Sequence, residues 1–277
     1  MTDQKVVLIT GASAGIGQAT AHLLAAKGFT VFGTSRKPDA TARPYRMLPL
    51  DVHSDTSVQT AVQSILDQTG RLDVLVNNAG YVQAGAIEES NVADALAQFD
   101  TNLFGVIRMI KAVLPVMRQQ GSGRIINISS IVGHIAAPYG GLYSASKFAL
   151  EGLSESLSAE VRQFGVSVSL VEPSYVNTPI VTQLPTSLIA DYTAGRQIAQ
   201  KSLSTNVKQG LEPGAVARVI LRAATTSRPR LRYPVGLDGE MALLLQRLLP
   251  ESAFEALKRR LFSSEKTAAP QAQTQPH

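Results

Sequence analysis

Short apolar runs rich in β-branched residues alternate with segments of helical period along most of this 277-residue chain. A continuous apolar run is typical of a strand buried on both faces, and strands joined through helices form a parallel sheet with right-handed crossovers. We therefore predict an α/β fold with a single domain over residues 1–235, a Rossmann-type doubly wound parallel β-sheet with helices on both faces. Strands are expected at 5–10, 30–34, 45–50, 73–76, 123–128, 166–171 and 231–235, and helices at 55–69, 100–117, 143–164 and 214–226.

The composition excludes several kinds of site. The chain has no cysteine, which excludes disulfides, thiolate metal sites and thiol nucleophiles, and its four histidines lack the spacing of metal ligands. Lysine and arginine exceed aspartate and glutamate by 26 − 21 = 5, yet the basic residues are spread and aromatic residues make up 5%, so no nucleic-acid site is expected. With no signal-peptide pattern and no apolar run of bilayer length, we expect a cytoplasmic protein.

A glycine-rich loop follows the first predicted strand. Gly11, Gly15 and Gly17 stand between that strand and a small-residue amphipathic helix, which we expect to end at Gly28. Glycines let a backbone approach a pyrophosphate, and a helix N-terminus presents free N–H donors and the positive end of its dipole. A plain tight turn is the alternative, but the position between a buried strand and a helix favours a dinucleotide cradle.

The end of the second predicted strand bears on the choice of cofactor. An acidic residue here binds the ribose 2′-hydroxyl of NAD, whereas an arginine accommodates a 2′-phosphate. Arg36 and Lys37 follow this strand and no carboxylate stands with them. NADP(H) is therefore the favoured cofactor, and a pair of solvated loop charges is the alternative.

Polar residues follow the third and fourth predicted strands, at the edge where such sheets bind ligands. Asp51 and Val52 follow the third strand, and Asn78 follows the fourth within Asn77–Gly80. Asp51 is expected near an adenine and Asn78 near a ribose, although asparagine and glycine are also ordinary residues between a strand and a loop.

Tyr143 and Lys147 are four residues apart in a predicted helix and therefore lie on one face. A phenol has a pKa near ~10, and a nearby cation lowers it by favouring the phenolate, which acid/base work near neutrality requires. Ser129 and Ser130 close the fifth predicted strand upstream. The same tyrosine and lysine spacing occurs on many solvated helices, so the other motifs decide its meaning.

Together these motifs resemble those of the short-chain dehydrogenase/reductases. The matching residues stand in that family's order and approximate spacing over residues 5–235, and the strand end at Arg36 is similar to that of NADP-preferring 17β-hydroxysteroid and retinol dehydrogenases. They are Thr10 to Gly17, Asn77 to Gly80, Asn102, Ser130, Tyr143, Lys147 and Pro173 to Thr178.

The resemblance implies a role for each matched residue. Tyr143 would be the general acid or base, and Lys147 would lower its pKa and bind the nicotinamide ribose. Ser130 would stabilise the substrate oxygen, and Asn102 would hold a water for proton supply, unless it is only a polar residue at a helix start. The implied cofactor contacts are Gly11, Ser13, Gly15, Ile16, Gly17, Arg36, Asp51, Val52, Asn78, Ala79, Gly80, Tyr143, Lys147, Pro173, Val176 and Thr178.

One residue departs from the family pattern. Ser174 stands where a glycine is common, and because only glycine permits a positive φ at no steric cost, we expect a different path of this loop over the nicotinamide. The departure does not argue against catalysis.

The remaining segments are expected to surround the substrate. Residues 178–211 are apolar enough for a lid over a lipophilic carbonyl compound, although a helix packed on the core would look the same. In the predicted helical extension, residues 236–263, the segment 240–249 is apolar over most of its circumference. Packing on the domain or on a second subunit is favoured over docking to a membrane surface, which Arg228, Arg230 and Arg232 would help. The tail 264–277 is expected to be disordered.

Two functions remain open. The first is an NADPH-dependent ketone or aldehyde reductase, which acts on a small molecule and, as the resemblance implies, forms a homodimer or homotetramer through the helices near 100–119 and 143–163. The second is a non-catalytic NADP-binding sensor or scaffold. Such proteins usually lack the tyrosine, lysine or serine, and this chain has all three.

Overall fold

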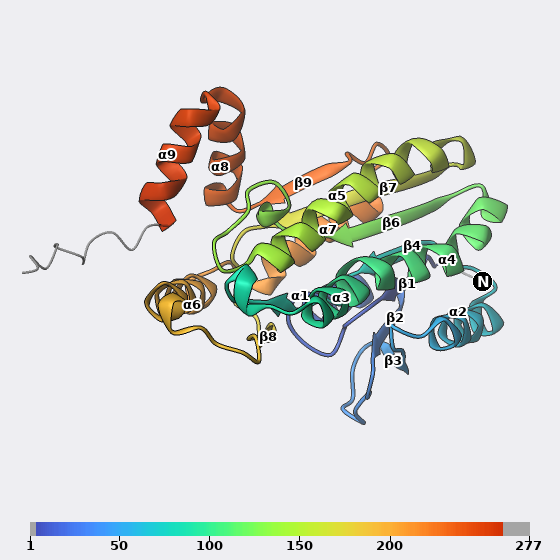
Figure 1. The fold of residues 1–277 in the computed structure, drawn as a ribbon. Helices are drawn as coiled ribbons and strands as arrows, with labels where there is room; N and C mark the ends of the chain where they lie inside the picture. The colour runs from blue at the N-terminus through green and yellow to red at the C-terminus, as the bar shows by residue number, and fades with distance from the viewer. Residues whose placement is uncertain (1–3, 263–277) are drawn as a thin grey trace, which may run out of the picture.

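The main sheet of the computed structural model, which describes residues 4–262, has seven strands, all parallel. Their order is β3-β2-β1-β4-β6-β7-β9, so the direction of winding changes between β1 and β4 (Figure 1). This confirms the predicted doubly wound sheet. The strands are β1 Val6–Ile9, β2 Thr30–Ser35, β3 Arg46–Pro49, β4 Val74–Asn77, β6 Gly123–Ile128, β7 Val166–Pro173 and β9 Arg232–Val235, and a small sheet pairs β5 Val82–Gln83 with β8 Thr182–Gln183.

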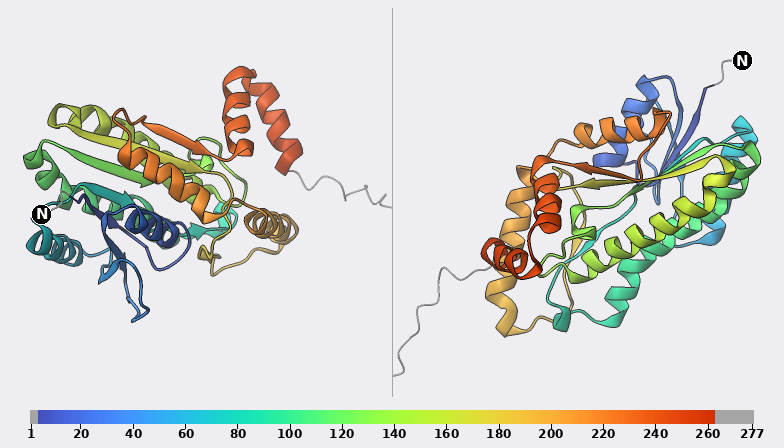
Figure 2. Two further views of the ribbon diagram at one scale, coloured as in Figure 1. Left: turned by 180° about the vertical axis from the view of Figure 1, so that it is seen from behind. Right: turned by 90° about the horizontal axis from the view of Figure 1, so that it is seen from above.

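Helices cover both faces of the sheet (Figure 2). Alternate residues of a strand point to opposite faces, and β1 shows this directly. Val6 and Leu8 belong to one hydrophobic cluster, whereas Val7 and Ile9 belong to the other. The first cluster includes α2 Asp55–Thr69, α4 Gly105–Gln120 and α5 Gly141–Val161, and the second includes α1 Gly15–Ala26 and α7 Pro213–Thr225.

The helix expected to start at Asp100 begins earlier. A helix α3 over Val92–Phe99 continues through a π-helical turn over Asp100–Phe104 into α4. Asn91 caps α3, because its side chain accepts from the Asp94 N–H while the Asp94 carboxylate accepts from the Asn91 N–H. The predicted start at Asp100 was wrong because the sequence analysis did not recognise this capping pair. The earlier start places Asn102 inside the π-helical turn rather than at the start of a helix.

The C-terminal third of the chain adds elements outside the sheet. They are η5 Ala190–Tyr192, α6 Thr193–Lys208, α8 Leu237–Leu248 and α9 Glu251–Phe262, and α8 and α9 form a hairpin beside the end of β9 (Figure 1). None of the helices within residues 4–262 is long and apolar enough to cross a membrane. The predicted disordered tail lies outside the described residues.

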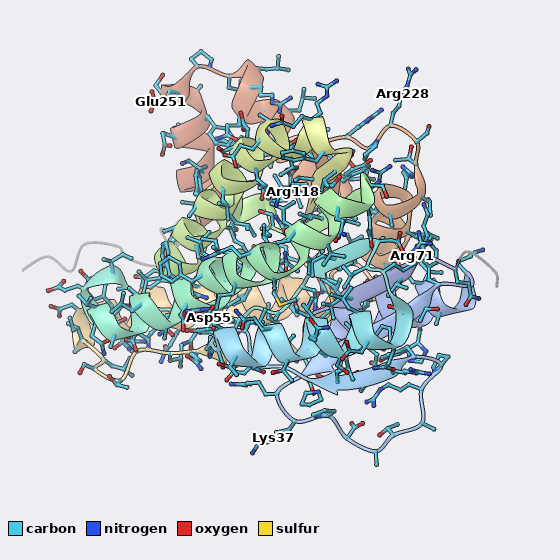
Figure 3. The ribbon with its side chains drawn as sticks, turned by 90° about the vertical axis from the view of Figure 1, so that its right-hand side faces the viewer. Lys37, Asp55, Arg71, Arg118, Arg228 and Glu251 are labelled. Carbon is cyan, nitrogen blue, oxygen red and sulfur yellow. The ribbon has the colours of Figure 1, made fainter. Side chains whose placement is uncertain are left out.

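Charged side chains of the described residues stand on several separate elements. Figure 3 shows Lys37, Asp55, Arg118, Arg228 and Glu251 on five different elements or loops. The modest positive net charge of +5 therefore comes from scattered residues rather than from one basic stripe.

Candidate active site

The carboxyl ends of the strands open into one large cavity of about 1040 Å³. Its walls come from the loop after β1, the ends of β2, β4, β6 and β7, the start of α5, and the helices α6, α8 and α9. It therefore lies where the winding of the sheet changes direction, the usual place for a ligand in such folds. Of the predicted site residues, only Gly17 and Asn102 do not line it.

The glycine loop has the geometry of an anion cradle. Gly11 and Gly15 have φ of +67° and +56°, in the left-handed region that favours glycine. Helix α1 begins at Gly15, no side chain caps its N-terminus and no acidic residue stands in its first turn, so its free N–H groups are available to the cavity. A Cβ on Gly17 would lie 2.3 Å from the Gly11 carbonyl oxygen, so Gly17 serves close packing. These features fit a pyrophosphate.

Two side chains from other segments donate hydrogen bonds to the backbone of this loop. The Asn78 amide donates to the carbonyl oxygens of Thr10 and Gly11 at 2.9 and 3.0 Å. The Tyr45 hydroxyl donates to the Ala12 carbonyl oxygen at 3.1 Å. Asn78 therefore has a bracing role that the sequence did not indicate, and Tyr45, a residue missed by the sequence analysis, fixes the opposite side of the loop.

Three side chains at the end of β2 border the cavity. Arg36 is exposed there, as its proposed role requires, and the hydroxyl oxygens of Thr34 and Ser35 are buried without a hydrogen-bond partner. Unpaired buried hydroxyls are unusual in a folded protein. The sequence analysis named neither residue as a candidate, although hydroxyls at the carboxyl end of this strand could have indicated them.

The polar residues Asp51, His53 and Thr101 line the cavity beyond the end of β3. Asp51 accepts a hydrogen bond from the His53 backbone N–H at 3.1 Å, and the His53 ring lies 2.7 Å from the Thr101 hydroxyl. Asp51 and Val52 lie where we expect the adenine, and His53 and Thr101 join them in the wall. Sequence spacing alone does not relate Thr101 to His53.

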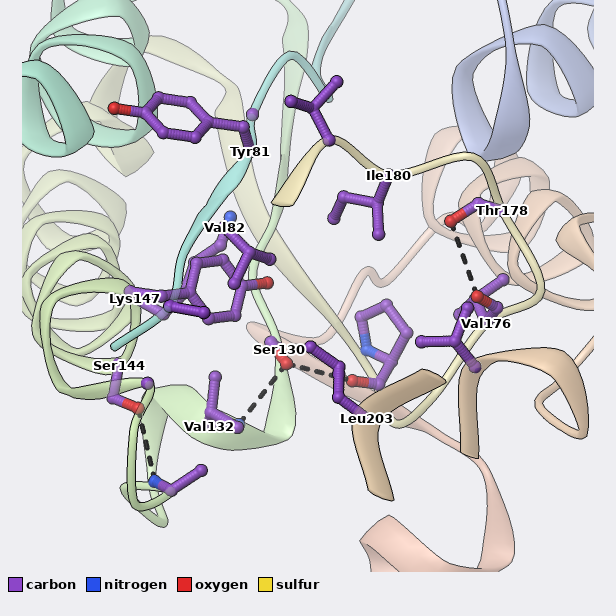
Figure 4. A pocket seen from close by; sticks show the side chains of 18 of the residues that line it. Tyr81, Val82, Ser130, Val132, Ser144, Lys147, Val176, Thr178, Ile180 and Leu203 are labelled. Carbon is purple, nitrogen blue, oxygen red and sulfur yellow. Dashed lines mark hydrogen bonds between the residues drawn. The ribbon is translucent and has the colours of Figure 1, made fainter. Parts of the chain in front are cut away.

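The predicted acid/base residues line the cavity near the end of β6, where Figure 4 shows Ser130 and Lys147. The Lys147 ammonium donates to the Ile128 carbonyl oxygen at 2.7 Å and lies 5.8 Å from the centre of the Tyr143 ring. The Ser130 hydroxyl lies next to the Tyr143 hydroxyl and also donates to the Pro173 carbonyl oxygen at 3.3 Å. A bond of that length is weak, so this hydroxyl can turn toward a substrate.

The choice of Ser130 over Ser129 has structural support. Ser129 is 3% exposed, and its Oγ lies beside Gly133 and Glu151, whereas Ser130 is the serine whose hydroxyl neighbours that of Tyr143. Successive residues of an extended segment point in opposite directions, so only one of the two can join Tyr143.

The pKa values of this group differ from the expectation. Burial raises the pKa of Tyr143 to about 12, an effect that the neighbouring Ser130 hydroxyl partly offsets. Burial also lowers the pKa of Lys147 to about 8, while Glu151 acts in the opposite direction. The predicted lowering of the Tyr143 pKa by Lys147 is wrong, because burial of the phenol dominates and disfavours the phenolate.

Comparisons with known proteins give the family. The family model described as short chain dehydrogenase matches residues 5–188. The chain belongs to this short-chain dehydrogenase family. A 3-ketodihydrosphingosine reductase of Bacteroides thetaiotaomicron is 42% identical over 236 residues, which cover 84% of this chain and 88% of the relative. A Bos taurus protein named retinol dehydrogenase 8 is 35% identical, with 82% and 80% covered.

Solved structures of short-chain dehydrogenases agree with the fold. A Burkholderia phymatum short chain dehydrogenase/reductase in complex with NAD superposes with a TM-score of 0.78 at 28% identity, over 92% of this chain and 95% of that one. ElxO with NADP bound gives a TM-score of 0.71 at 27% identity, over 84% and 97%. Similar proteins thus bind either nicotinamide dinucleotide.

In this short-chain dehydrogenase, Asn102 lies behind the cavity wall. It is 1% exposed, its amide nitrogen donates to the Tyr81 carbonyl oxygen and to the Ser146 hydroxyl, each at 3.1 Å, and its carbonyl oxygen accepts from the Tyr81 N–H at 3.2 Å. Both amide hydrogens are engaged. The proposed water of the proton relay would therefore have to donate to the free lone pair of the carbonyl oxygen.

The segment after β7 carries the departure at Ser174. Among the described non-glycine residues only Tyr139 has a positive φ, so the backbone at Ser174 does not need glycine. Its N–H donates to the Val235 carbonyl oxygen at 2.9 Å, and its hydroxyl occupies space beside Gly236 that a Cβ there would fill. Further along, Thr178 contacts Gly15 of the cradle.

Four ionisable side chains lie beside the segment of residues 129–133, which we call the serine loop. The His134 ring nitrogen is 3.6 Å from the Glu151 carboxylate and 3.4 Å from that of Glu172. The Arg232 guanidinium lies 3.0 and 3.6 Å from the same two carboxylates. Within the described residues, His134, Glu151 and Glu172 are close enough to hold a metal ion, a grouping that sequence spacing did not reveal. Arg232 supplies the positive charge there instead.

A buried ion pair anchors the predicted lid. Arg196 of α6 contacts the Glu89 carboxylate, which also accepts the Ile189 N–H at 2.9 Å, and both charged residues are buried. Backbone hydrogen bonds and Arg196 hold the pKa of Glu89 below its ordinary value against the opposing effect of burial. The Tyr192 hydroxyl donates to Glu88 at 2.6 Å. The lid is therefore tied to the loop before α3.

Proposed function

We propose that this short-chain dehydrogenase is an NADP(H)-dependent oxidoreductase that interconverts a ketone or aldehyde and its alcohol on a lipophilic substrate. The observation that supports this most is that the Tyr143 and Ser130 hydroxyls lie together, with Lys147 beside them, in the cavity that the glycine loop lines. One substrate oxygen could therefore contact both hydroxyls.

The roles of these residues follow from their environment. The dinucleotide, when bound, supplies or accepts the hydride. Tyr143 donates its proton to the carbonyl oxygen as the alcohol forms, and the raised pKa keeps the phenol protonated for that step. Ser130 donates a hydrogen bond to the same oxygen. Lys147 keeps one N–H on the Ile128 carbonyl oxygen and has two more for Tyr143 and the ribose.

The end of β2 supports NADP(H) over NAD(H). Arg36 borders the cavity, and the unpaired hydroxyls of Thr34 and Ser35 stand beside it. A guanidinium and two hydroxyls suit a phosphate, whereas the 2′-hydroxyl of NAD would lack a carboxylate partner at this strand end.

The opposite end of the cavity supports a lipophilic substrate. Apolar side chains from β5, the loop after β6, the lid, α8 and α9 line it, and two relatives are named for reactions of a ketodihydrosphingosine and of retinol. We place the NADP-binding domain in residues 1–235 with its lid in 178–211, and the extension 236–263 as one cavity wall. The lining residues are Val82, Ile135, Ile180, Val181, Ile198, Leu203, Leu245, Phe254 and Leu257.

A homo-oligomer through α4 and α5 is part of the proposal. Phe104, at the start of α4, is 42% exposed and Phe148 of α5 is 45% exposed. The π-helical turn that carries Phe104 packs on α5, and exposed aromatic rings are enriched at interfaces.

Turnover of NADPH with a panel of long-chain ketones and aldehydes tests the function. Tyr143→Phe should reduce kcat by about 1000-fold or more and leave the NADPH dissociation constant within about 2-fold. Ser130→Ala should reduce kcat by about 100-fold, while the neighbouring Ser129→Ala serves as its matched control and should stay near wild type. Full turnover in Tyr143→Phe would contradict the proposal, and NADPH binding without turnover of any compound would favour a sensor or scaffold.

A further inference from the structure

Helix α8 has a face that packs on the domain. A Cβ on Gly239 would lie 2.6 Å from the Ile131 side chain, so the helix backbone approaches the serine loop closely. The Gln246 amide donates to the His134 carbonyl oxygen at 3.1 Å, and Ala242 lines the cavity. This inner face fixes the orientation of α8.

The opposite face of α8 is apolar and uncovered. Leu237, Met241, Leu244 and Leu248 are 85%, 55%, 49% and 70% exposed. Their spacing of four, three and four residues places them on one stripe of the helix, about 180° from the inner face. Four large apolar side chains in a row on a described helix differ from the scattered exposed apolar residues that any surface carries.

The stripe is complementary to itself. In an antiparallel pair of α8 helices related by a two-fold axis, Leu237 faces Leu248 of the partner subunit, and Met241 faces Leu244 of the partner subunit, because both pairs of residue numbers sum to 485. Glu240 and Arg247, both exposed, lie seven residues apart along one edge of the stripe. In this arrangement Glu240 lies within reach of Arg247 of the partner subunit, because the two residues are offset by only about 3 Å along the helix axis.

We propose that the outer face of α8 is an interface that binds a second copy of this chain in the antiparallel arrangement. The proposal is independent of the reaction. Because Ala242 and Leu245 of the same helix line the cavity, the second copy would also support the cavity wall from outside. A helix of 12 residues is about 18 Å long and buries less area than a standard interface, so the contact should be weak and concentration-dependent unless the α4 and α5 surface joins the same assembly.

The charges of α8 favour a protein partner over a membrane. Interfacial helices carry lysine and arginine on their polar face. Asp238 and Glu240 stand in the first turn of α8 and only Arg247 in its last, and Glu251 follows at the start of α9. Arg232, which would help the less favoured alternative of a membrane contact, is engaged with Glu151 and Glu155.

Cysteine cross-linking tests the register, and the cysteine-free chain makes the test specific. Chains carrying L237C and chains carrying L248C are mixed and treated with a short bismaleimide. We expect a cross-linked dimer in the mixture and little in either variant alone, because like positions are 11 residues apart, about 16 Å along the axis. Equal cross-linking in all three samples, or none in the mixture, would overturn the arrangement.

A charge exchange tests the same contact without cysteines. E240R and R247E alone should each raise the dissociation constant of the α8 contact by about 10-fold in analytical ultracentrifugation, and the double variant E240R/R247E should restore it. M241E/L244E should raise it by about 100-fold. An assembly unchanged by M241E/L244E would assign the oligomer to another surface. Vesicles of phosphatidylcholine and phosphatidylserine test the alternative. A wild type that is monomeric and binds these vesicles, together with an M241E/L244E variant that does not bind them, would replace the proposal with a membrane contact.

Discussion

Lys147 lies one helical turn after Tyr143, with its ammonium 5.8 Å from the centre of the Tyr143 ring and bound to the Ile128 carbonyl oxygen. The two groups are buried together, and burial acts on them in opposite directions: it raises the pKa of the phenol to about 12 and lowers that of the ammonium to about 8. The group that titrates nearest to neutrality is therefore the lysine.

Carbonyl reduction should consequently decline in alkaline solution. Above a pH of about 8 the protein loses the Lys147 charge while Tyr143 remains protonated, so kcat/KM for reduction should fall as the pH rises from about 7 to about 10. Lys147→Arg, which stays charged, should be slower at neutral pH but lose this decline. A wild-type profile that stays flat through pH 10 would contradict the assignment.

Glu151 offers a second test of the same group. It lies one turn after Lys147 on α5, and its charge acts to raise the Lys147 pKa. Glu151→Gln should move the alkaline decline of kcat/KM to lower pH. Glu155→Gln is the matched control, since Glu155 also binds Arg232 but is exposed and does not affect Lys147. Identical pH profiles for wild type and Glu151→Gln would contradict the effect of Glu151 on the Lys147 pKa.

Cofactor choice should depend on Arg36. Arg36→Asp replaces a phosphate partner with a group that repels a phosphate, so the ratio of kcat/KM for NADPH to that for NADH should fall by about 100-fold. Lys37→Asp makes the same kind of charge change on the next residue, which is exposed but does not line the cavity, and should alter the ratio far less. If the two variants changed the ratio equally, net charge rather than a specific contact would be the cause.

The sequence predicted the sheet well because its central strands β1, β4, β6 and β7 are buried almost throughout. A strand such as β1 is apolar at every position and leaves little choice of structure. The glycine loop, Tyr143 and Lys147 were predictable because their spacing along one loop or one helix already determines their proximity.

Contacts between distant segments were beyond the reach of the sequence. Tyr45 reaches the loop after β1 only through the pairing of β2 with β3. The position of Asn102 in its helical segment was predicted wrongly, because the helix was expected to start at Asp100 and α3 starts before it. The expected low pKa of Tyr143 failed for another reason, because burial cannot be estimated from the spacing of a tyrosine and a lysine.

Stability should depend on pH through His134. Its pKa is raised above the ordinary value, chiefly by the Glu172 carboxylate 3.4 Å from its ring and against the opposing effect of burial, with Glu151 adding to the rise and Arg232 opposing it. The stabilisation is therefore fully present below the unfolded pKa of about 6.5 and is lost as the pH rises through the raised folded value. The difference in unfolding free energy between wild type and His134→Gln should be larger at about pH 5.5 than at about pH 9. Urea titrations at both values measure it, and an equal difference would show that His134 stays neutral.

The lid should control substrate binding through the pair of Glu89 and Arg196. Both side chains are buried, and Glu89 also accepts backbone N–H groups from Ala86 and from Ile189 within the lid. Removing one partner leaves a buried charge uncompensated, so Arg196→Met should loosen α6. We expect KM for a lipophilic carbonyl compound to rise by about 10-fold or more, and KM for NADPH to change by less than about 2-fold. Arg222→Met, an exposed arginine on α7, is the matched control. Equal increases in both KM values would indicate general destabilisation rather than a lid that closes over the substrate.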